Sequence, residues 1–273
     1  MAAPAVVLAD TTTGSPAVSK SLAVIRDLLR KRRPDLPIEL IELGGPHSNL
    51  DTVLADLKSQ DIAEAVFVPL DLRSAVEYRS ELDDAAKTFD ANGIRAVVSR
   101  PIGPATELLN ILDAYVRDTL QAHGAMELDG LVLVMRSGAD ARGAALIARR
   151  VRQWSAHHRL PVQLAVEDGD GSATAQAVQA LRAQGRRAVA VGGTFLTPGP
   201  AYQAHAAAAR RAGAIAVTPP IGESPQLSQL ILARYAFGAM ELLDGQPQPV
   251  TVDDDYQFLS PRRRRSLTPR DED

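Results

Sequence analysis

Polar side chains that could bind a metal ion or transfer protons follow the first three apolar runs of the chain. Asp10 ends the first run, His47 follows the second, and Asp71 and Glu77 follow the third. Carboxylate oxygens together with an imidazole nitrogen suit a divalent metal ion. Each residue alone also fits a structural role, because Asp10 can cap a helix and Glu77 can be a solvated helix charge.

The elements that must position these side chains form a regular alternation. Short runs rich in Val, Ile and Leu predict strands at 5–9, 38–42, 64–70, 95–99, 131–135, 162–166, 187–191 and 214–218. Longer amphipathic stretches between them predict helices at 18–33, 48–60, 75–92, 105–123, 141–157, 173–184, 201–212 and 225–243. Several strands are apolar throughout, as expected where helices cover both faces of a sheet. Strict alternation predicts an α/β fold with parallel strands, and ligands bind at the carboxyl ends of such strands.

The second half of the chain repeats the first. The run Arg-Ala-Val-Val-Ser-Arg-Pro-Ile-Gly at 95–103 matches Ile-Ala-Val-Thr-Pro-Pro-Ile-Gly at 215–222, and similar pairs occur at offsets between 119 and 125 residues. We therefore predict two tandem modules, each a parallel sheet flanked by helices, at 1–124 and 125–245. Residues 246–273 are rich in Pro, Asp and Arg, and we predict a disordered tail there.

Composition limits the classes of function. The chain has 273 residues, a net charge of −3 and no cysteine. This excludes disulfides and thiolate metal sites, and it offers nucleic acid or an anionic membrane no overall electrostatic attraction. No apolar run reaches the ~20 residues that span a bilayer, and the first residues do not resemble a signal peptide. We expect a soluble cytoplasmic protein with neither nucleic acid nor membrane as a partner.

Five segments in order carry a resemblance to a known family. They read Pro-Ile-Glu-Leu-Ile-Glu-Leu-Gly-Gly-Pro (37–46), Val-Phe-Val-Pro-Leu (66–70), Arg-Pro-Ile-Gly (100–103), Leu-Thr-Pro-Gly (196–199) and Pro-Pro-Ile-Gly (219–222). With the duplication, they resemble the class II metallochelatases, the sirohydrochlorin cobalt- and iron-chelatases of the cobalamin and siroheme pathways. The resemblance implies a lyase that inserts a divalent ion into a tetrapyrrole held between the modules. The ion, Co, Fe or Ni, would be a co-substrate, and no organic cofactor is implied.

The two histidines that do the central work in that family are replaced here. The first falls on Asp10, or on Thr13 if the Thr-Gly-Ser sequence at 13–15 is taken as the equivalent loop, and the second falls on Glu77. An acidic residue four positions after the second is kept as Glu81. A carboxylate is a weaker base in water than imidazole, and oxygen ligands favour harder ions than cobalt or nickel.

The resemblance therefore implies a set of site residues with different roles. Asp10, Glu77 and Glu81 are the predicted catalytic residues. The predicted substrate contacts are Thr13, Gly14, Ser15 and Leu72, and the predicted metal ligands are Asp10, Glu77 and His47. Two functions stay open: a chelatase with this altered pair, or a catalytically silent paralogue that binds a tetrapyrrole, a metal or a protein partner. We expect a monomer in either case.

Other patterns have structural interpretations. The sequence Asp-Thr-Thr at 10–12 lacks the second aspartate of a phosphatase loop. The sequence Asp-Gly-Asp-Gly-Ser at 168–172 lacks the glutamate that closes a calcium loop, so we predict a flexible loop with Ser172 as the helix N-cap. His157 and His158 end a helix, where cations interact favourably with the helix dipole, and we favour this over a metal site. The four arginines at 262–265 are interpreted as part of a solvated tail.

Overall fold

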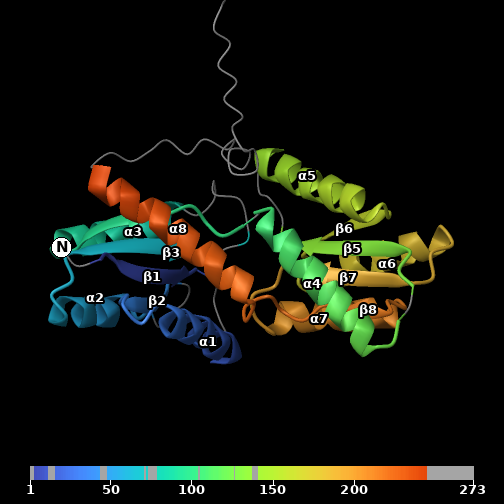
Figure 1. The fold of residues 1–273 in the computed structure, drawn as a ribbon, viewed down its shortest axis with the longest axis horizontal. Coiled ribbons are helices and arrows are strands. Elements are labelled where there is room, and N and C mark those ends of the chain that lie inside the picture. The colour runs from blue at the N-terminus through green and yellow to red at the C-terminus, as the bar shows by residue number, and fades with distance from the viewer. Residues whose placement is uncertain are drawn as a thin grey trace, which may run out of the picture.

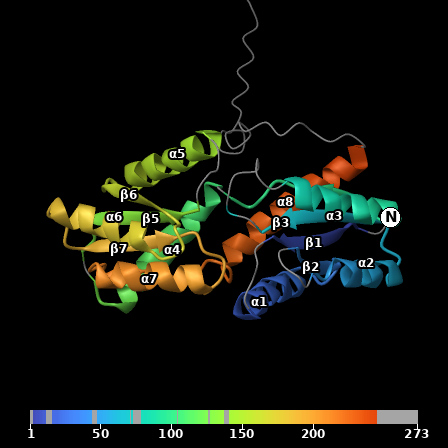
Figure 2. The same ribbon diagram turned by 180° about the vertical axis from the view of Figure 1, so that it is seen from behind.

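The structure, a computed structural model, describes residues 3–11, 16–43, 48–70, 72, 79–103, 105–125, 127–136 and 141–244. It contains two four-stranded parallel sheets, each flanked by helices, which lie side by side along the long axis of the molecule (Figure 1). Seen from behind, the same two layered units are joined in the middle by the α4 and α8 helices (Figure 2). The predicted α/β class with two tandem modules is confirmed.

The first sheet has the strand order β2-β1-β3-β4, and all of its pairings are parallel. Its elements are β1 (Ala5–Asp10), α1 (Pro16–Arg32), β2 (Ile38–Glu42), α2 (Leu50–Ser59), β3 (Glu64–Pro69), α3 (Arg79–Ala91) and β4 (Arg95–Val98). The chain moves outward from β1 to β2 and then returns to the other side of β1 with β3. This reversal creates a topological switch point between β1 and β3, where ligands bind in open parallel sheets.

The second sheet repeats this order as β6-β5-β7-β8. Its elements, with the helix that precedes them, are α4 (Glu107–Ala122), β5 (Gly130–Met135), α5 (Ala141–His158), β6 (Val162–Val166), α6 (Ser172–Ala183), β7 (Val189–Gly193), α7 (Pro200–Arg211), β8 (Ala216–Val217) and α8 (Pro225–Asp244). Equivalent backbone hydrogen bonds confirm the duplication, because Leu43 N donates to Asp10 O at 2.7 Å and Glu167 N donates to Met135 O at 2.8 Å. Asp10 and Met135 therefore occupy the same position in the two repeats.

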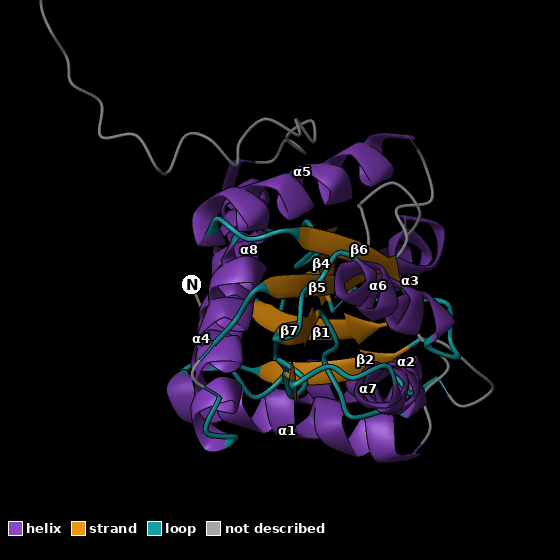
Figure 3. Ribbon diagram, turned by 90° about the vertical axis from the view of Figure 1, so that its right-hand side faces the viewer, coloured by secondary structure: helices purple, strands orange, loops and turns teal. Residues whose placement is uncertain are grey.

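The last helix of each repeat packs on the sheet of the other repeat. The α4 helix lies against β7 and β8, whereas α8 lies against β3 and β4. Gly238 of α8 comes so close to β3 that a Cβ atom there would lie 2.5 Å from Val66 Cγ1. Figure 3 shows α4 and α8 on the same side of the molecule, where they contact each other. The module boundary between residues 124 and 125 stays a prediction from the sequence repeat. The α4 and α8 helices each pack on the module on the other side of it.

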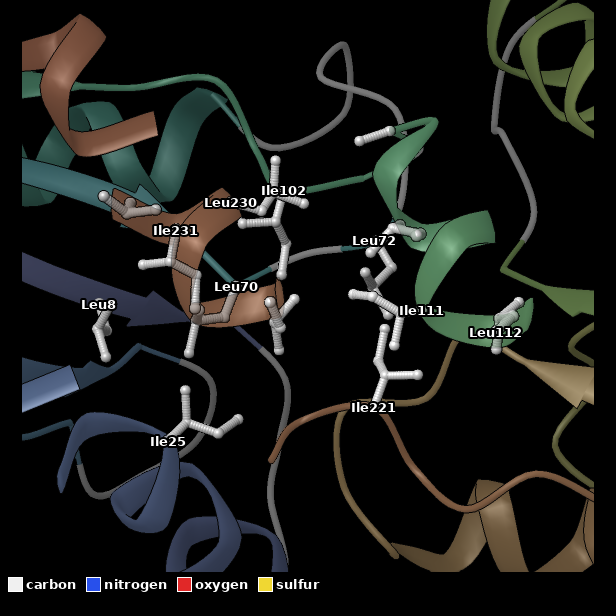
Figure 4. Close-up of a cluster of buried hydrophobic side chains, with 14 of the residues drawn as sticks. Leu8, Ile25, Leu70, Leu72, Ile102, Ile111, Leu112, Ile221, Leu230 and Ile231 are labelled. Carbon is white, nitrogen blue, oxygen red and sulfur yellow. The ribbon is translucent and has the colours of Figure 1, made fainter. Parts of the chain in front are cut away.

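This exchange produces one hydrophobic core that runs through both modules. Figure 4 shows Leu8 and Ile25 of the first module, Ile111 and Leu112 of α4, and Ile221 and Leu230 of the second half in the same cluster. Two smaller clusters fill the opposite faces, one under α2 and α3 and the other under α6 and α7. The two modules are therefore joined by buried apolar side chains, in addition to the chain connection.

The seventh strand lies two residues later than predicted. The prediction of 187–191 ended the strand before two glycines, but β7 spans Val189–Gly193. The Asp129 carboxylate accepts hydrogen bonds from the Arg187 and Ala188 N–H groups at 2.7 and 2.9 Å, which delays the strand. Gly192 belongs to the strand because it pairs with Leu133, and the Trp154 ring covers it, since a Cβ atom there would lie 2.9 Å from the ring. In the strand pairing, Gly193 is the equivalent of Pro69.

The α6 helix also begins differently from the prediction, because Asp168 caps it instead of Ser172. Ser172 is the first helical residue, and Gly171 is the N-cap with a φ of 82°. One Asp168 carboxylate accepts hydrogen bonds from Gly171 N at 2.8 Å, Ser172 Oγ at 2.8 Å and Ala173 N at 2.6 Å. The loop is thus ordered by a carboxylate that satisfies the free N–H groups of the helix start.

Candidate functional site

The carboxyl ends of the two sheets converge. Val18 lies in the first turn of α1, which follows β1, and Gly199 is the N-cap of α7, which follows β7. These residues touch, since a Cβ atom on Gly199 would lie 2.9 Å from Val18 Cγ2. Gly222, after β8, is similarly placed, and its Cβ would lie 3.0 Å from Ile25 Cδ1. The α1 helix, which follows β1, therefore meets the segments that follow β7 and β8, near the edge where ligands of parallel sheets bind.

Two carboxylates lie next to each other on the first of these edges. Asp10 is the last residue of β1, and its partner in the parallel pairing is Glu42, the last residue of β2. Side chains of paired residues share a face, and neighbouring strands are ~4.8 Å apart. Alternation along each strand places Asp10 on the face of Leu8 and Glu42 on the face of Leu40, the face that α1 covers. Asp10 is only 5% exposed.

Hydroxyl groups accompany these acids on the same face. Ser19 of α1 donates a hydrogen bond from Oγ to Glu42 Oε2 at 2.8 Å, which links the edge to the covering helix. Ser99 follows β4, is buried, and lies against Gly238 of α8. The sequence analysis missed Glu42 and Ser19. The signal for Glu42 was available, since it ends an apolar run just as Asp10 does, but the pairing of the two runs was needed to bring them together.

In the described part of the second module, the equivalent edge carries no pair of strand-end acids. Met135 stands in the place of Asp10, and its pairing partner Val166 stands in the place of Glu42. Val166 is 38% exposed, which is unusual for a large apolar side chain at the end of a strand. The next residues form an ion pair, with Arg136 Nε 2.8 Å from Glu167 Oε2. Among the described residues, the pair of strand-end acids therefore belongs to the first module.

Glu241, in the last turn of α8, lies within electrostatic reach of Arg100 of the first module. Burial raises the pKa of Glu241 above its ordinary value, and the positive charge of Arg100 acts in the opposite direction. Arg100 begins the Arg-Pro-Ile-Gly segment after β4. The exchanged helix therefore supplies charge as well as apolar cover to the first module.

Of the residues predicted from sequence, Asp10, Glu81 and Leu72 are described. Glu81 is exposed in the first turn of α3, where a negative charge is favoured by the helix dipole. Leu72 is buried, and its backbone packs so closely on Gly103 that a Cβ there would lie 2.5 Å from Leu72 Cα. Leu196 and Gly222 repeat this contact in the second module, so it is a feature of the fold. The substrate role of Leu72 and the catalytic role of Glu81 stay predictions.

The other predicted residues lie outside the described residues. These are Thr13, Gly14, Ser15, His47, Asp71 and Glu77. The first three belong to the segment between β1 and α1, the fourth to the segment between β2 and α2, and the last two to the segment between β3 and α3. All three segments start at the carboxyl edge that carries Asp10 and Glu42. Chemically, the described part of this edge offers two carboxylates, which can bind a cation or accept protons.

Comparisons with known proteins agree with this architecture. The family model CbiX matches residues 8–119, which include both Asp10 and Glu42. No curated protein matches the sequence. None of the helices in the described ranges is both long enough and apolar enough to cross a bilayer.

Three solved structures show the same fold over most of the chain. The sirohydrochlorin chelatase SirB from Bacillus subtilis subspecies spizizenii, in complex with cobalt, is 14% identical, with a TM-score of 0.68 over 89% of this chain and 98% of its own. CbiX, described as the terminal enzyme of siroheme biosynthesis in denitrifying bacteria, is 17% identical, with a TM-score of 0.60 over 89% and 100%. The chelatase-like DR2241 from Deinococcus radiodurans is 15% identical, with a TM-score of 0.64 over 87% and 56%. The chain therefore has the fold of the class II chelatases.

Proposed function

We propose that this protein binds a tetrapyrrole between the carboxyl edges of its two sheets and inserts a divalent metal ion into it. The observation that carries the proposal is the pairing of Asp10 with Glu42 at the end of β1 and β2, on an edge that the second module meets. Two findings support it: the CbiX match covers this edge, and SirB, a sirohydrochlorin chelatase, has the same fold. The proposed metals are Co, Fe and Ni as co-substrates, in a pathway of the cobalamin or siroheme type.

The proposed chemistry is an exchange of one metal ion for two protons. As the ion binds the macrocycle nitrogens, two pyrrole N–H groups lose their protons, and carboxylates at the edge accept them. Asp10 would deliver the metal and accept a proton together with Glu77, with Glu42 as a further acceptor. Glu81 would act as a secondary acid, and His47 as an additional metal ligand. Thr13, Gly14, Ser15 and Leu72 would contact the macrocycle.

A second candidate function is binding of the tetrapyrrole without catalysis. The observation that favours it is the hydrogen bond from Ser19 to Glu42 at 2.8 Å, which gives this carboxylate a structural role in holding α1. Glu42 would then hold α1 in place instead of accepting protons from the macrocycle. In either case, the exposed Val166 at the carboxyl edge of the second sheet would pack against the flat macrocycle.

The experiment is a spectral titration of sirohydrochlorin with Co²⁺, Fe²⁺ or Ni²⁺ in the presence of the protein. Metal insertion shifts the absorption bands of the macrocycle, and Asp10→Asn should slow this shift about a hundredfold, within the range of general acid–base effects. Glu64→Gln is the matched control, since this acid begins β3 at the opposite edge of the same sheet. Macrocycle binding without metal-dependent turnover would support the second candidate. Absence of both binding and turnover would overturn the tetrapyrrole proposal.

A further inference from the structure

A separate cluster of metal-ligating side chains lies where α4 meets α5. Asp113 comes from α4, and His157 and His158 are the last two residues of α5. Asp113 Oδ1 lies 2.7 Å from His158 Nε2, and Asp113 Oδ2 lies 3.5 Å from His157 Nε2. The three ligand atoms all lie within 4.8 Å of one another. Donor atoms around a four-coordinate ion at about 2.1 Å are roughly 3.4 Å apart, so small side-chain movements suffice to admit an ion.

This cluster is remote from the edge described above. The α5 helix leads from the carboxyl end of β5 back to the amino end of β6. Its last residues, His157 and His158, therefore lie at the amino end of the second sheet, whereas the acids Asp10 and Glu42 lie at the carboxyl end of the first. An ion in the cluster could not take part in the chemistry at the carboxyl edges directly.

The surroundings of the cluster hold the side chains in place. The buried Trp154 donates a hydrogen bond from Nε1 to Asp113 Oδ1. Its ring contacts the His158 ring edge-on, at 5.6 Å between centroids, and the His158 ring contacts the His157 ring at 4.9 Å. Partners outside the ligand set that fix a ligand's orientation are typical of metal sites. Trp154 thus holds Oδ1 of Asp113 by its hydrogen bond, whereas Oδ2 of the same carboxylate lies nearest to His157.

Exposure is graded across the cluster in a way that allows an ion to enter. The Asp113 side chain is 13% exposed and that of His158 is 22% exposed, whereas His157 is 67% exposed. An ion would enter past His157, and water could complete its coordination from the same side. The two histidines are neighbours at the end of α5. The third ligand, Asp113, comes from the α4 helix.

We propose that Asp113, His157 and His158 bind one divalent cation of the Zn²⁺, Co²⁺ or Ni²⁺ class. Two neutral imidazoles and one carboxylate are a ligand set that suits these ions, and His158 would release its hydrogen bond to Asp113 as it binds. The ion would join α5 of the second module to α4, the helix that follows the last strand of the first sheet. It would therefore stabilise the exchange of helices on which the single core depends. This inference does not rest on the proposed chelatase activity.

The test is calorimetric titration of the full-length protein with ZnCl₂, and visible absorption with CoCl₂, without any macrocycle. We expect one ion to bind at this cluster, and His157→Gln and Asp113→Asn each to weaken its binding at least tenfold. His157→Gln changes an exposed side chain and should leave the fold intact. His123→Gln is the matched control, because His123 is an exposed histidine at the end of α4 that lies outside the cluster. It should bind zinc as the unchanged protein does.

The Asp10→Asn variant separates this site from the carboxyl edge. Zinc affinity that is unchanged in Asp10→Asn and lost in His157→Gln supports the proposal. Affinity lost in Asp10→Asn and kept in His157→Gln, or equal in all variants, overturns it. A second readout is the midpoint of thermal unfolding, which saturating zinc should raise in the unchanged protein and in His123→Gln but not in His157→Gln. Equal shifts in all three proteins would also contradict a site at this cluster.

Discussion

At the scale of single residues, the chemistry of this protein depends on where carboxylates and imidazoles end up after folding. Asp10 was identified from the sequence because a polar residue at the end of an apolar run must lie at the edge of the sheet. Glu42 ends another such run, but its pairing with Asp10 depends on the register of β1 and β2. The same limit applies to Asp113 and the two histidines, which are more than forty residues apart in the chain.

Asp168→Asn should destabilise the protein near neutral pH. Burial alone raises the pKa of Asp168, but hydrogen bonds from Ala173, Ser172 and Gly171, with the attraction of His205, outweigh it and lower the pKa from 3.8 to about 2. The lowered pKa stabilises the folded protein at pH values above 3.8, the pKa of the unfolded chain. This stabilisation is lost as the pH falls from 3.8 through about 2. Because solvent screens this partly exposed carboxylate, the expected loss of unfolding free energy is about 1 kcal/mol.

Urea unfolding of both proteins near pH 7 and in acid measures this effect. The free energies of unfolding of the unchanged protein and of Asp168→Asn should differ near neutral pH. They should converge as the pH falls from 3.8 to about 2. Asp51→Asn is the control, because Asp51 is also an acid in the first turn of a helix. A constant difference at all pH values would show that the lowered pKa is not the cause.

The buried His205 should make the fold sensitive to mild acid. Its side chain is 2% exposed, with Nδ1 2.6 Å from Thr174 Oγ1 and Nε2 3.3 Å from Asp168 Oδ1 outside hydrogen-bonding geometry. Burial lowers the pKa of His205 below 6.5, and the charges of Asp168, Glu167 and Asp170 oppose this. The unfolded chain therefore takes up a proton at a higher pH than the folded protein, and stability falls as pH drops below 6.5.

Comparison of the unchanged protein with His205→Gln measures this contribution. The loss of unfolding free energy between about pH 7 and about pH 5.5 should be smaller in the variant, because the group that takes up the proton is missing. His123→Gln should keep the full loss, because His123 is exposed in the native structure. Equal slopes in His205→Gln and the unchanged protein would contradict the assignment.

At the scale of elements, the predicted strands and helices are confirmed with small changes at their ends. Four glycines follow helices with positive φ: Gly93, Gly124, Gly185 and Gly213, at +86°, +63°, +85° and +92°. The differences at the ends have two causes. Asp129 and the Trp154 ring, which are distant in sequence, set the bounds of β7. Asp168 lies only four residues before Ser172, so the cap of α6 is a local contact that was predicted at the wrong side chain.

Gly222→Ala should destabilise the protein by about 1–3 kcal/mol, the usual cost of overpacking. A Cβ atom at this position would lie 2.2 Å from the backbone oxygen of Leu196, so the two loops would have to separate. Chemical unfolding measures the loss. Gly130→Ala is the control, since its nearest contact is a leucine methyl group at 3.3 Å, which can move. Equal losses in the two variants would contradict a role for the close backbone contact.

At the scale of the whole molecule, the exchanged helices decide what counts as a folding unit. A chain that ends at Ser224 lacks α8, which contributes Leu227, Leu230, Ile231, Tyr235 and Leu242 to the shared core. The apolar side of β3 and β4 that α8 covers would then be exposed, and we expect loss of cooperative unfolding and binding of a hydrophobic dye. A chain that ends at Asp244 keeps every described element and serves as the control. Cooperative unfolding of the shorter chain would show that the first module folds without α8.

The sequence alone determined the class of this protein: parallel strands, alternating helices, two repeats, and a likeness to the chelatases that the comparisons support as a fold. Periodicity and turn residues act over a few positions, so they can be recognised without the rest of the chain. The tertiary structure decided which acids stand together at the edge, which helix covers which sheet, and that Asp113 meets two histidines. Each of these depends on the register of strands and the crossing of distant helices, which are set by burial of the whole apolar surface at once.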